Sequence, residues 1–128
     1  MDEKKDLLKF IIICEDAFMS QSNTLSIIKI FDKLKVENVP AVIAKFSVVT
    51  KFKIDHGLHK HKIIIKNSKD ELIIELEGDI MIEDSKSFGQ YIGTFLGIRF
   101  KTFGKYTIEI EIDSIKQSLN TEFYVEKL

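Results

Sequence analysis

The sequence predicts an all-β protein: a single antiparallel β-sandwich, immunoglobulin-like in architecture, with about 7–9 strands. Short apolar segments rich in Ile and Val alternate with turn-like clusters along the chain, a spacing typical of sandwiches and barrels. Several segments alternate apolar with charged residues at every second position, as half-buried antiparallel strands do. The turn-like clusters lie at residues 20–23, 37–40, 56–57, 67–70, 83–87, 103–105 and 113–120.

One folded domain accounts for the whole chain. Among its 128 residues Pro40 is the only proline, and no Gly/Ser-rich linker divides them. We expect a flexible N-terminus over residues 1–6 and one sandwich domain over residues 7–128. The start is acidic and the apolar run after it is too short to span a bilayer. We therefore expect a cytoplasmic protein that makes no contact with a membrane.

A row of charges between residues 45 and 79 predicts a three-stranded meander. Six lysines share one parity of two segments, and four acidic residues share the matching parity of a third: Lys45, Lys51, Lys53, Lys60, Lys62 and Lys66, then Glu71, Glu75, Glu77 and Asp79. A hairpin turn at His56-Gly57 would place Lys53 opposite Lys60. A second turn at residues 67–70 would place Lys62 opposite Glu75, which offsets the repulsion within the lysine row. We interpret this surface as a solvated, charge-balanced sheet face rather than an anion site.

The remaining strands follow from the same alternation. Residues 106–113 and 122–126 each alternate inward apolar and outward polar side chains. The continuous apolar run at residues 10–14 suits a central strand. Residues 25–34 fit either a strand or an amphipathic helix, and their β-branched content favours the strand.

The composition argues against several functional classes. The formal net charge is −1 and Arg99 is the only arginine, whereas nucleic-acid binders usually carry a basic excess with several arginines. Cys14 stands alone in an apolar run, so it forms no intrachain disulfide and is not an activated thiol. Glu109 and Glu111 project from a strand into solvent, and no serine lies in a glycine-framed elbow. We predict no catalytic residue, no enzymatic activity, no cofactor and no nucleic-acid partner.

Two histidines offer a candidate metal site. His59 and His61 point to the same side of a predicted strand, about 6.5–7 Å apart, a spacing that suits two ligands of one metal. The same side carries Ile63 and Ile65, however, and a histidine that closes the end of a core is the commoner arrangement. His59 and His61 thus remain a candidate metal pair without a complete ligand set.

A glycine-rich segment at residues 91–99 offers a candidate contact surface. If Ile92, Leu96, Ile98 and Phe100 form the inward row, then Tyr91, Phe95 and Arg99 face outward between glycines. Tyr, Phe and Arg are enriched in interface centres. The alternative is that another segment covers Phe95, or that the odd-numbered residues form the inward row. We take Tyr91, Phe95 and Arg99 as the candidate partner-binding residues, with Phe18 and Met19 at an adjoining loop.

Several short motifs together resemble an uncharacterised family of small bacterial proteins of unknown function, for which a β-sandwich fold is expected. They are Ile-Ile-Ile-Cys-Glu-Asp-Ala at residues 11–17, Ile-Phe-Asp-Lys-Leu at 30–34, Pro40 leading into Phe46, Gly-Leu-His at 57–59, Phe-Gly-Lys-Tyr at 103–106, Tyr-Thr-Ile-Glu-Ile-Glu-Ile-Asp at 106–113, and Phe-Tyr-Val at 123–125. The resemblance supports a strand at residues 25–32 and implies a positional role for His59. It supplies no catalytic residues.

These observations predict a cytoplasmic, non-catalytic binding or assembly module that acts through a protein partner or self-association. The alternative is a small-molecule or metal-binding sandwich that uses His59 and His61 at its mouth.

Overall fold

A computed structural model of the chain describes residues 3–22, 24–84 and 88–128. Within these ranges the elements are η1 (Glu3–Lys5), β1 (Leu8–Met19), β2 (Leu25–Ile30), β3 (Lys33–Val36), β4 (Ala41–Phe52), β5 (Gly57–Asn67), β6 (Leu72–Ile82), β7 (Gly89–Phe100), β8 (Gly104–Ile112), β9 (Ile115–Lys116) and β10 (Thr121–Lys127). The predicted turns at 20–23 and 83–87, and the predicted flexible segment 1–6, lie partly outside the described residues.

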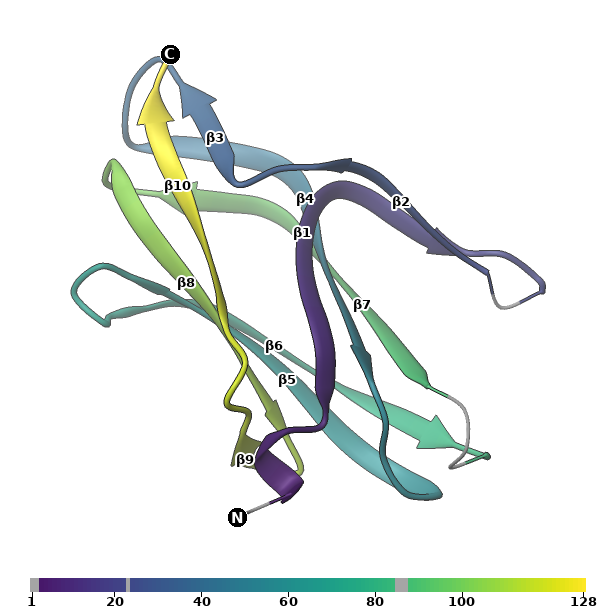
Figure 1. Cartoon of the computed structure of the whole chain (residues 1–128). Helices are drawn as coiled ribbons and strands as arrows, with labels where there is room; N and C mark the ends of the chain where they lie inside the picture. The colour runs from purple at the N-terminus through teal and green to yellow at the C-terminus, as the bar shows by residue number, and fades with distance from the viewer. Residues whose placement is uncertain (1–2, 23, 85–87) are drawn as a thin grey trace.

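The strands form two sheets that face each other (Figure 1). The first sheet has the order β2-β1-β4-β7, and the second has the order β3-β10-β8-β5-β6 with β9 paired to β8. The described strand pairs are antiparallel except that β10 and β3 run parallel. The all-β prediction is confirmed, with ten strands in the described residues. No helix within these residues has the length and apolar character needed to cross a bilayer.

The chain changes sheets between β2 and β3. The Phe31 amide donates to the Ile13 carbonyl (3.2 Å) and so continues the first sheet, whereas the Tyr124 amide donates to the Asp32 carbonyl (2.8 Å) in the second. Residues 25–34 are therefore extended, as predicted, but they contribute two short strands to different sheets. This division and the short β9 explain why the strand count exceeds the predicted range.

The predicted hairpin at His56-Gly57 is wrong. β4 lies in the first sheet and β5 in the second, so the two strands face each other across the core instead of pairing edge to edge. Their inward side chains still meet as neighbours: the rings of Phe52 and His61 lie 5.7 Å apart. The alternation of apolar and polar residues shows which side of a strand is buried. It is the same whether two strands pair edge to edge in one sheet or face each other from two sheets.

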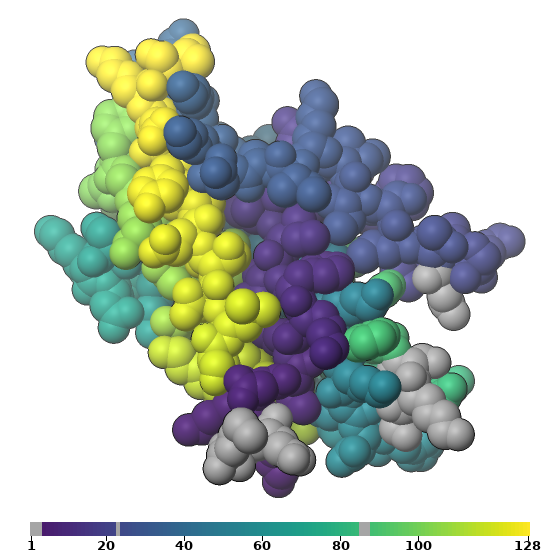
Figure 2. Space-filling model, viewed as in Figure 1, coloured from purple at the N-terminus to yellow at the C-terminus, as the bar shows by residue number. Residues whose placement is uncertain are grey.

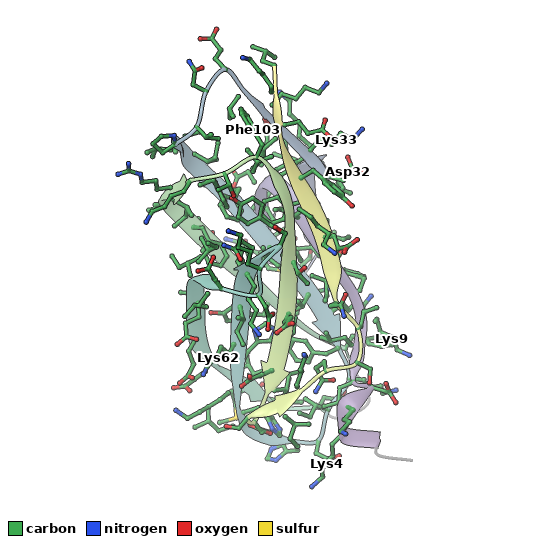
Figure 3. The ribbon with its side chains drawn as sticks, turned by 90° about the vertical axis from the view of Figure 1, so that its left-hand side faces the viewer. Lys4, Lys9, Asp32, Lys33, Lys62 and Phe103 are labelled. Atoms are coloured by element: carbon green, nitrogen blue, oxygen red, sulfur yellow. The ribbon has the colours of Figure 1, made fainter. Side chains whose placement is uncertain are left out.

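The outer face of the second sheet carries part of the predicted charge row in a shifted register, whereas Lys45 and Lys51 lie in β4 of the first sheet. Lys62 lies opposite Glu77 instead of Glu75, and Lys60 lies opposite Asp79. The shift is two residues, and because side chains alternate with a period of two, the charged side chains of this sheet keep their predicted face. Leu72, expected inside, lies opposite Lys66 beyond a bulge and is exposed. The Nζ atoms of Lys60 and Lys62 lie 3.5 and 3.7 Å from Glu77 carboxylate oxygens. Figure 3 shows Lys62 on this surface, which is charge-balanced as expected.

An aromatic cluster fills one half of the space between the sheets. It consists of Phe46, Phe95, Phe100, Tyr106 and Phe123, all of them buried. Phe46 stacks on Phe95 with ring centroids 5.0 Å apart, and Tyr106 stacks on Phe123 at 5.5 Å. Phe100 meets Tyr106 and Phe123 edge to face. Such pairs add stability beyond area burial, about 0.5–1.5 kcal/mol each, and here they join strands of both sheets.

The two ends of the chain close one side of the sandwich. β1 and β10 lie next to each other on the face shown in Figure 2. Below them the buried Gln117 side chain accepts a hydrogen bond from the Leu7 amide (3.0 Å) and donates one to the Lys4 carbonyl (2.8 Å). β1, β10 and Gln117 therefore cover this side of the core. On the opposite side, β7 and β6 are the edge strands of the first and second sheets.

Candidate binding surface

The last strand of the first sheet, β7, is an edge strand. Among the described residues it pairs with β4 alone, over the full length from Gly89 to Phe100. Its other side presents backbone N–H and C=O groups without a strand partner, the feature that natural sheets usually protect. A long edge of this kind is a template for a further strand.

The edge strands differ in how they are protected. β6 carries Glu75, Glu77 and Asp79, and β3 is short and carries Lys33 and Lys35. β2 is also short, and Lys29 interrupts it with a positive φ of 55°. In β7 the only charged residue is Arg99, near the end of the strand. β7 therefore lacks the charges and the shortness that block edge-to-edge pairing, and its left-handed residue, Gly97, lies close to its end.

The structure corrects the predicted orientation of Phe95. Its side chain points between the sheets, is only 3% exposed, and stacks on Phe46. Phe95 is thus part of the core and not of a contact surface. Leu96, predicted to point inward, is instead 69% exposed.

Gly97 is the cause of this reversal. Phe95 and Ile98 both point inward although they are three positions apart, so the alternation changes phase between them. Gly97 lies there with φ of 62°, a left-handed conformation that glycine adopts without strain. The prediction is therefore right for Ile98 and Phe100, which follow the glycine, and wrong for Leu96, which precedes it.

The other two predicted contact residues lie apart from each other. Tyr91 points between the sheets: its ring stacks on His61 with centroids 4.3 Å apart, and it occupies the space that a Cβ atom at Gly78 would need. Burial raises the pKa of Tyr91. Arg99 is exposed on the outer side, beyond Gly97. Tyr91, Phe95 and Arg99 therefore share a strand but form no common surface.

The outward side of β7 consists of different residues, namely Ile92, Thr94 and Leu96. Ile92 lies opposite Val49 of β4 and packs on a small second core on the outer face of the first sheet. This outer apolar cluster comprises Cys14, Ala17 and Val49 with Phe10, Ile12, Leu25, Ile27 and Ile92. Ile92 thus extends the outer apolar cluster to the open edge. The sequence does not reveal this, because the alternation of β7 changes phase at Gly97.

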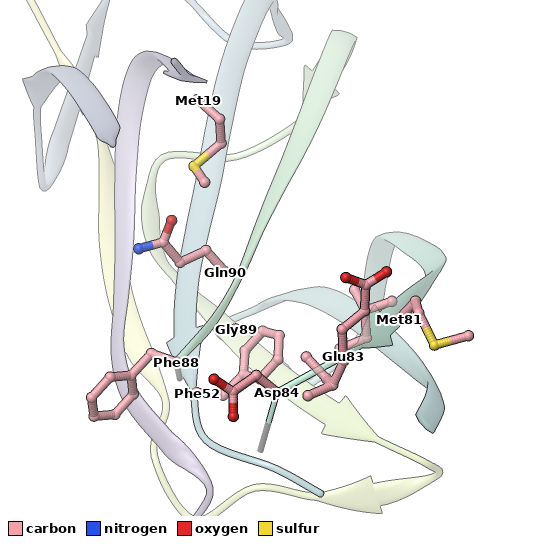
Figure 4. Close-up of a pocket in the computed structure, with 10 residues that line it drawn as sticks. Met19, Phe52, Met81, Glu83, Asp84, Phe88, Gly89 and Gln90 are labelled. Atoms are coloured by element: carbon pink, nitrogen blue, oxygen red, sulfur yellow. The ribbon is translucent and has the colours of Figure 1, made fainter. Parts of the chain in front are cut away.

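A hollow of about 590 Å³ lies at the start of β7 (Figure 4). Met19, Phe52, Met81 and Phe88 line it, with Glu83 and Asp84 as acidic lining residues and Gly89 and Gln90 from β7. Phe18 and Met19, predicted to adjoin the contact surface, lie at the end of β1 and are both partly exposed. The open edge of β7 therefore adjoins, at its N-terminal end, a hollow that is lined largely by apolar side chains.

His61 is a core residue. It has no exposed surface, and its Nε2 shares a hydrogen bond of 2.7 Å with the Thr50 hydroxyl. Its Nδ1 has no hydrogen-bond partner among the described residues. Because burial disfavours the charged ring, the pKa of His61 falls from 6.5 to about 4.

His59 lies at the end of the sandwich beside a second hollow of about 710 Å³. Its Nδ1 donates to the Asp113 carboxylate (2.6 Å) and its Nε2 donates to the Asp55 carbonyl (2.8 Å). Both partners are acceptors, so this arrangement favours the ring that carries protons on both nitrogens. Burial lowers the pKa of His59, but the hydrogen bond to Asp113 and the carbonyl contact outweigh it and the pKa is raised.

This geometry does not favour the predicted metal pair. Both ring nitrogens of His59 are already engaged by Asp113 and the Asp55 carbonyl, and His61 is enclosed in the core. The described ranges contain no group of three His, Cys, Asp or Glu side chains placed to hold a metal ion. Metal binding by His59 and His61 stays a prediction, whereas the positional role implied for His59 agrees with its contacts.

The fold and the edge define a small two-sheet all-β domain with one unprotected edge strand. A family model described as a family of unknown function (DUF6941) matches residues 9–126, and the chain belongs to this family. This confirms the resemblance to a family of unknown function. Curated protein sequences give no match to the chain.

The core position of Phe95 has a direct test. Phe95→Ala is expected to lower the free energy of unfolding by about 3–5 kcal/mol, because it opens a cavity in the aromatic cluster. Leu96→Ala, one position along, should change it by no more than about 0.5 kcal/mol. Urea unfolding followed by far-UV circular dichroism measures both. Equal effects of the two changes would contradict the phase change at Gly97.

The buried neutral His61 predicts loss of stability in acid. Its folded pKa lies below the unfolded value, so its contribution is complete above pH 6.5 and is lost as the pH falls toward 4. Between pH 7.5 and 5.0 the loss through this residue should be about 2 kcal/mol. Urea unfolding at both pH values should show a weaker pH dependence in His61→Gln than in the wild type.

His59→Gln is the matched control for this experiment. The raised pKa of His59 gives it the opposite sign: its ion pair contributes fully below the unfolded pKa and less as the pH rises through the folded pKa. His59→Gln should therefore become less stable relative to the wild type on acidification. A pH dependence unchanged in His61→Gln would rule out a neutral, enclosed His61.

Proposed function

We propose that the chain is a non-catalytic binding or assembly module that acts through protein contact, by strand addition at the open edge of β7. The observation that carries the proposal is the combination of length and chemistry in this edge: it runs from Gly89 to Phe100 and carries Arg99 as its only charge. In strand addition, main-chain hydrogen bonds supply affinity and side chains on alternate positions supply specificity.

The surroundings of the edge support this proposal. Tyr91 turns inward over Gly78, so its side chain leaves the outer side of the strand free. Ile92 and Leu96 offer apolar contacts on the outer face, where a protein strand would lie beside them. An extended segment of protein therefore finds both unpaired backbone groups and aliphatic side chains in one place.

The alternative expected from the sequence, small-molecule or metal binding through His59 and His61, has weaker support. The hollow beside His59 is lined by Lys4, Lys53, Asp55 and Asp113. His59 is already held by Asp113 and the Asp55 carbonyl, and these contacts explain its position without a ligand. No contact within the described residues accounts in the same way for the long uncharged edge of β7. This difference favours strand addition over binding at His59 and His61.

A charge placed on the edge should block strand addition. Thr94→Lys adds a lysine at the middle of β7, where it mimics the charges that protect other edges. Thr94 is exposed, and the change removes one hydrogen bond of 3.3 Å between its hydroxyl and that of the buried Ser47, so we expect the fold to stay intact. We expect the gently purified wild type to retain an associated polypeptide in native mass spectrometry, and Thr94→Lys to lose at least nine-tenths of it. The control is Leu72→Lys on the opposite edge strand β6, also at an exposed position.

The outcome separates the edge from the rest of the surface. Strand addition at β7 is supported if Thr94→Lys loses the associated polypeptide and Leu72→Lys retains it. A wild-type chain that carries no associated polypeptide, or equal retention in both variants, contradicts the proposal. Equal urea midpoints for the three proteins establish that folding is not the cause.

A further inference from the structure

Resting on the proposed function, we infer that the strand added to β7 is β7 of a second copy of this chain. The two strands run antiparallel about a two-fold axis that passes beside Thr94. This arrangement joins two first sheets into one continuous sheet, the closed and isologous form that two identical subunits most commonly take.

The side chains of β7 are self-complementary in this register. With Thr94 opposite its own copy, Ile92 lies opposite Leu96 of the other chain on the outer face, and this pair occurs twice. On the inner face Phe95 lies opposite Gly93 of the other chain, also twice. Aromatic rings opposite edge glycines and aliphatic cross-strand pairs are both stabilising combinations in antiparallel sheets.

The charges favour β7 over the other edges as a self-pairing strand. The paired segment on either side of Thr94, residues 92–96, carries no charge, and Arg99 lies beyond Gly97, so no like charges meet. Pairing β6 with itself about Glu77 would place glutamates opposite each other and Glu75 opposite Asp79. Like charges directly opposite destabilise a sheet. Among the edges, β7 therefore combines length with freedom from self-repulsion.

The outer apolar cluster gives the pairing a second source of stability. Ile92 already packs against this cluster and is partly buried, whereas Leu96 is 69% exposed. In the dimer Leu96 of each copy would lie next to Ile92 of the other and extend the cluster across the new strand pair. The exposed Leu96 of each chain thus becomes covered by the β7 strand of its copy.

Cysteine cross-linking tests both the partner and the register. Directly opposed residues in an antiparallel pair have Cα atoms about 4.5–5.5 Å apart, within the range of a disulfide. Thr94→Cys should therefore give a covalent dimer under mild oxidation. Leu96→Cys is the control, because position 96 lies about 13 Å from its own copy along the strand. We expect cross-linking of Leu96→Cys to be at least tenfold slower.

Sedimentation velocity of the purified chain over a concentration series gives the noncovalent test. We expect the wild type and Thr94→Val to dimerise with similar dissociation constants, and Thr94→Lys to raise the constant at least tenfold because two lysines would meet at the axis. A wild type that stays monomeric throughout, or equal cross-linking at positions 94 and 96, would overturn the self-pairing.

The failure of this inference differs from failure of the proposed function. If the pure chain is monomeric while native mass spectrometry shows another polypeptide that Thr94→Lys removes, the second copy is wrong and strand addition stands. If Thr94→Lys removes no associated polypeptide of any kind, both are wrong. A dimer that survives Thr94→Lys would move the interface away from β7 and likewise overturn both.

Discussion

The structure depends on the stacking of Phe46 on Phe95 inside the aromatic cluster. The two residues are cross-strand partners in β4 and β7, and the Phe46 ring also meets Phe100 and Phe123 in the space between the sheets. With Phe95 committed to the core, its neighbours Thr94 and Leu96 must point outward. The cluster that stabilises the sandwich therefore also determines which residues the open edge presents to solvent.

Glycines allow β7 to lie close to the second sheet. A Cβ atom at Gly93 would meet Ile63 and Leu76, and one at Gly89 would meet Phe52 and Ile82. The inward positions of β7 are thus glycines where the second sheet comes close, and Phe95 where the aromatic cluster fills the space between the sheets. Gly97 then reverses the alternation and returns Ile98 to the core. Packing therefore explains Gly89, Gly93 and Gly97 in β7, and also Gly78 beside it, without a ligand.

The sequence predicts the faces of most strands but not how the strands are partnered. The alternation in residues 106–112 and 123–125 places Tyr106 and Phe123 in the core correctly, because each strand has one wet and one dry side. The same alternation cannot distinguish a hairpin between β4 and β5 from two strands that face each other across the core. The pattern also assigns Phe95 to the wrong face, because the left-handed backbone conformation of Gly97 is not visible in the order of the residues.

The contrast among edges argues that β7 is left open for a reason. Like-charged side chains on β6 and β3, and the kink at Lys29 in β2, each discourage pairing at little cost to the fold. One lysine at position 94 would protect β7 at a small cost, since the Thr94 side chain is exposed and its hydroxyl makes a single hydrogen bond, to the buried Ser47. Stability of the isolated domain therefore does not explain the uncharged edge, whereas the proposed strand addition does.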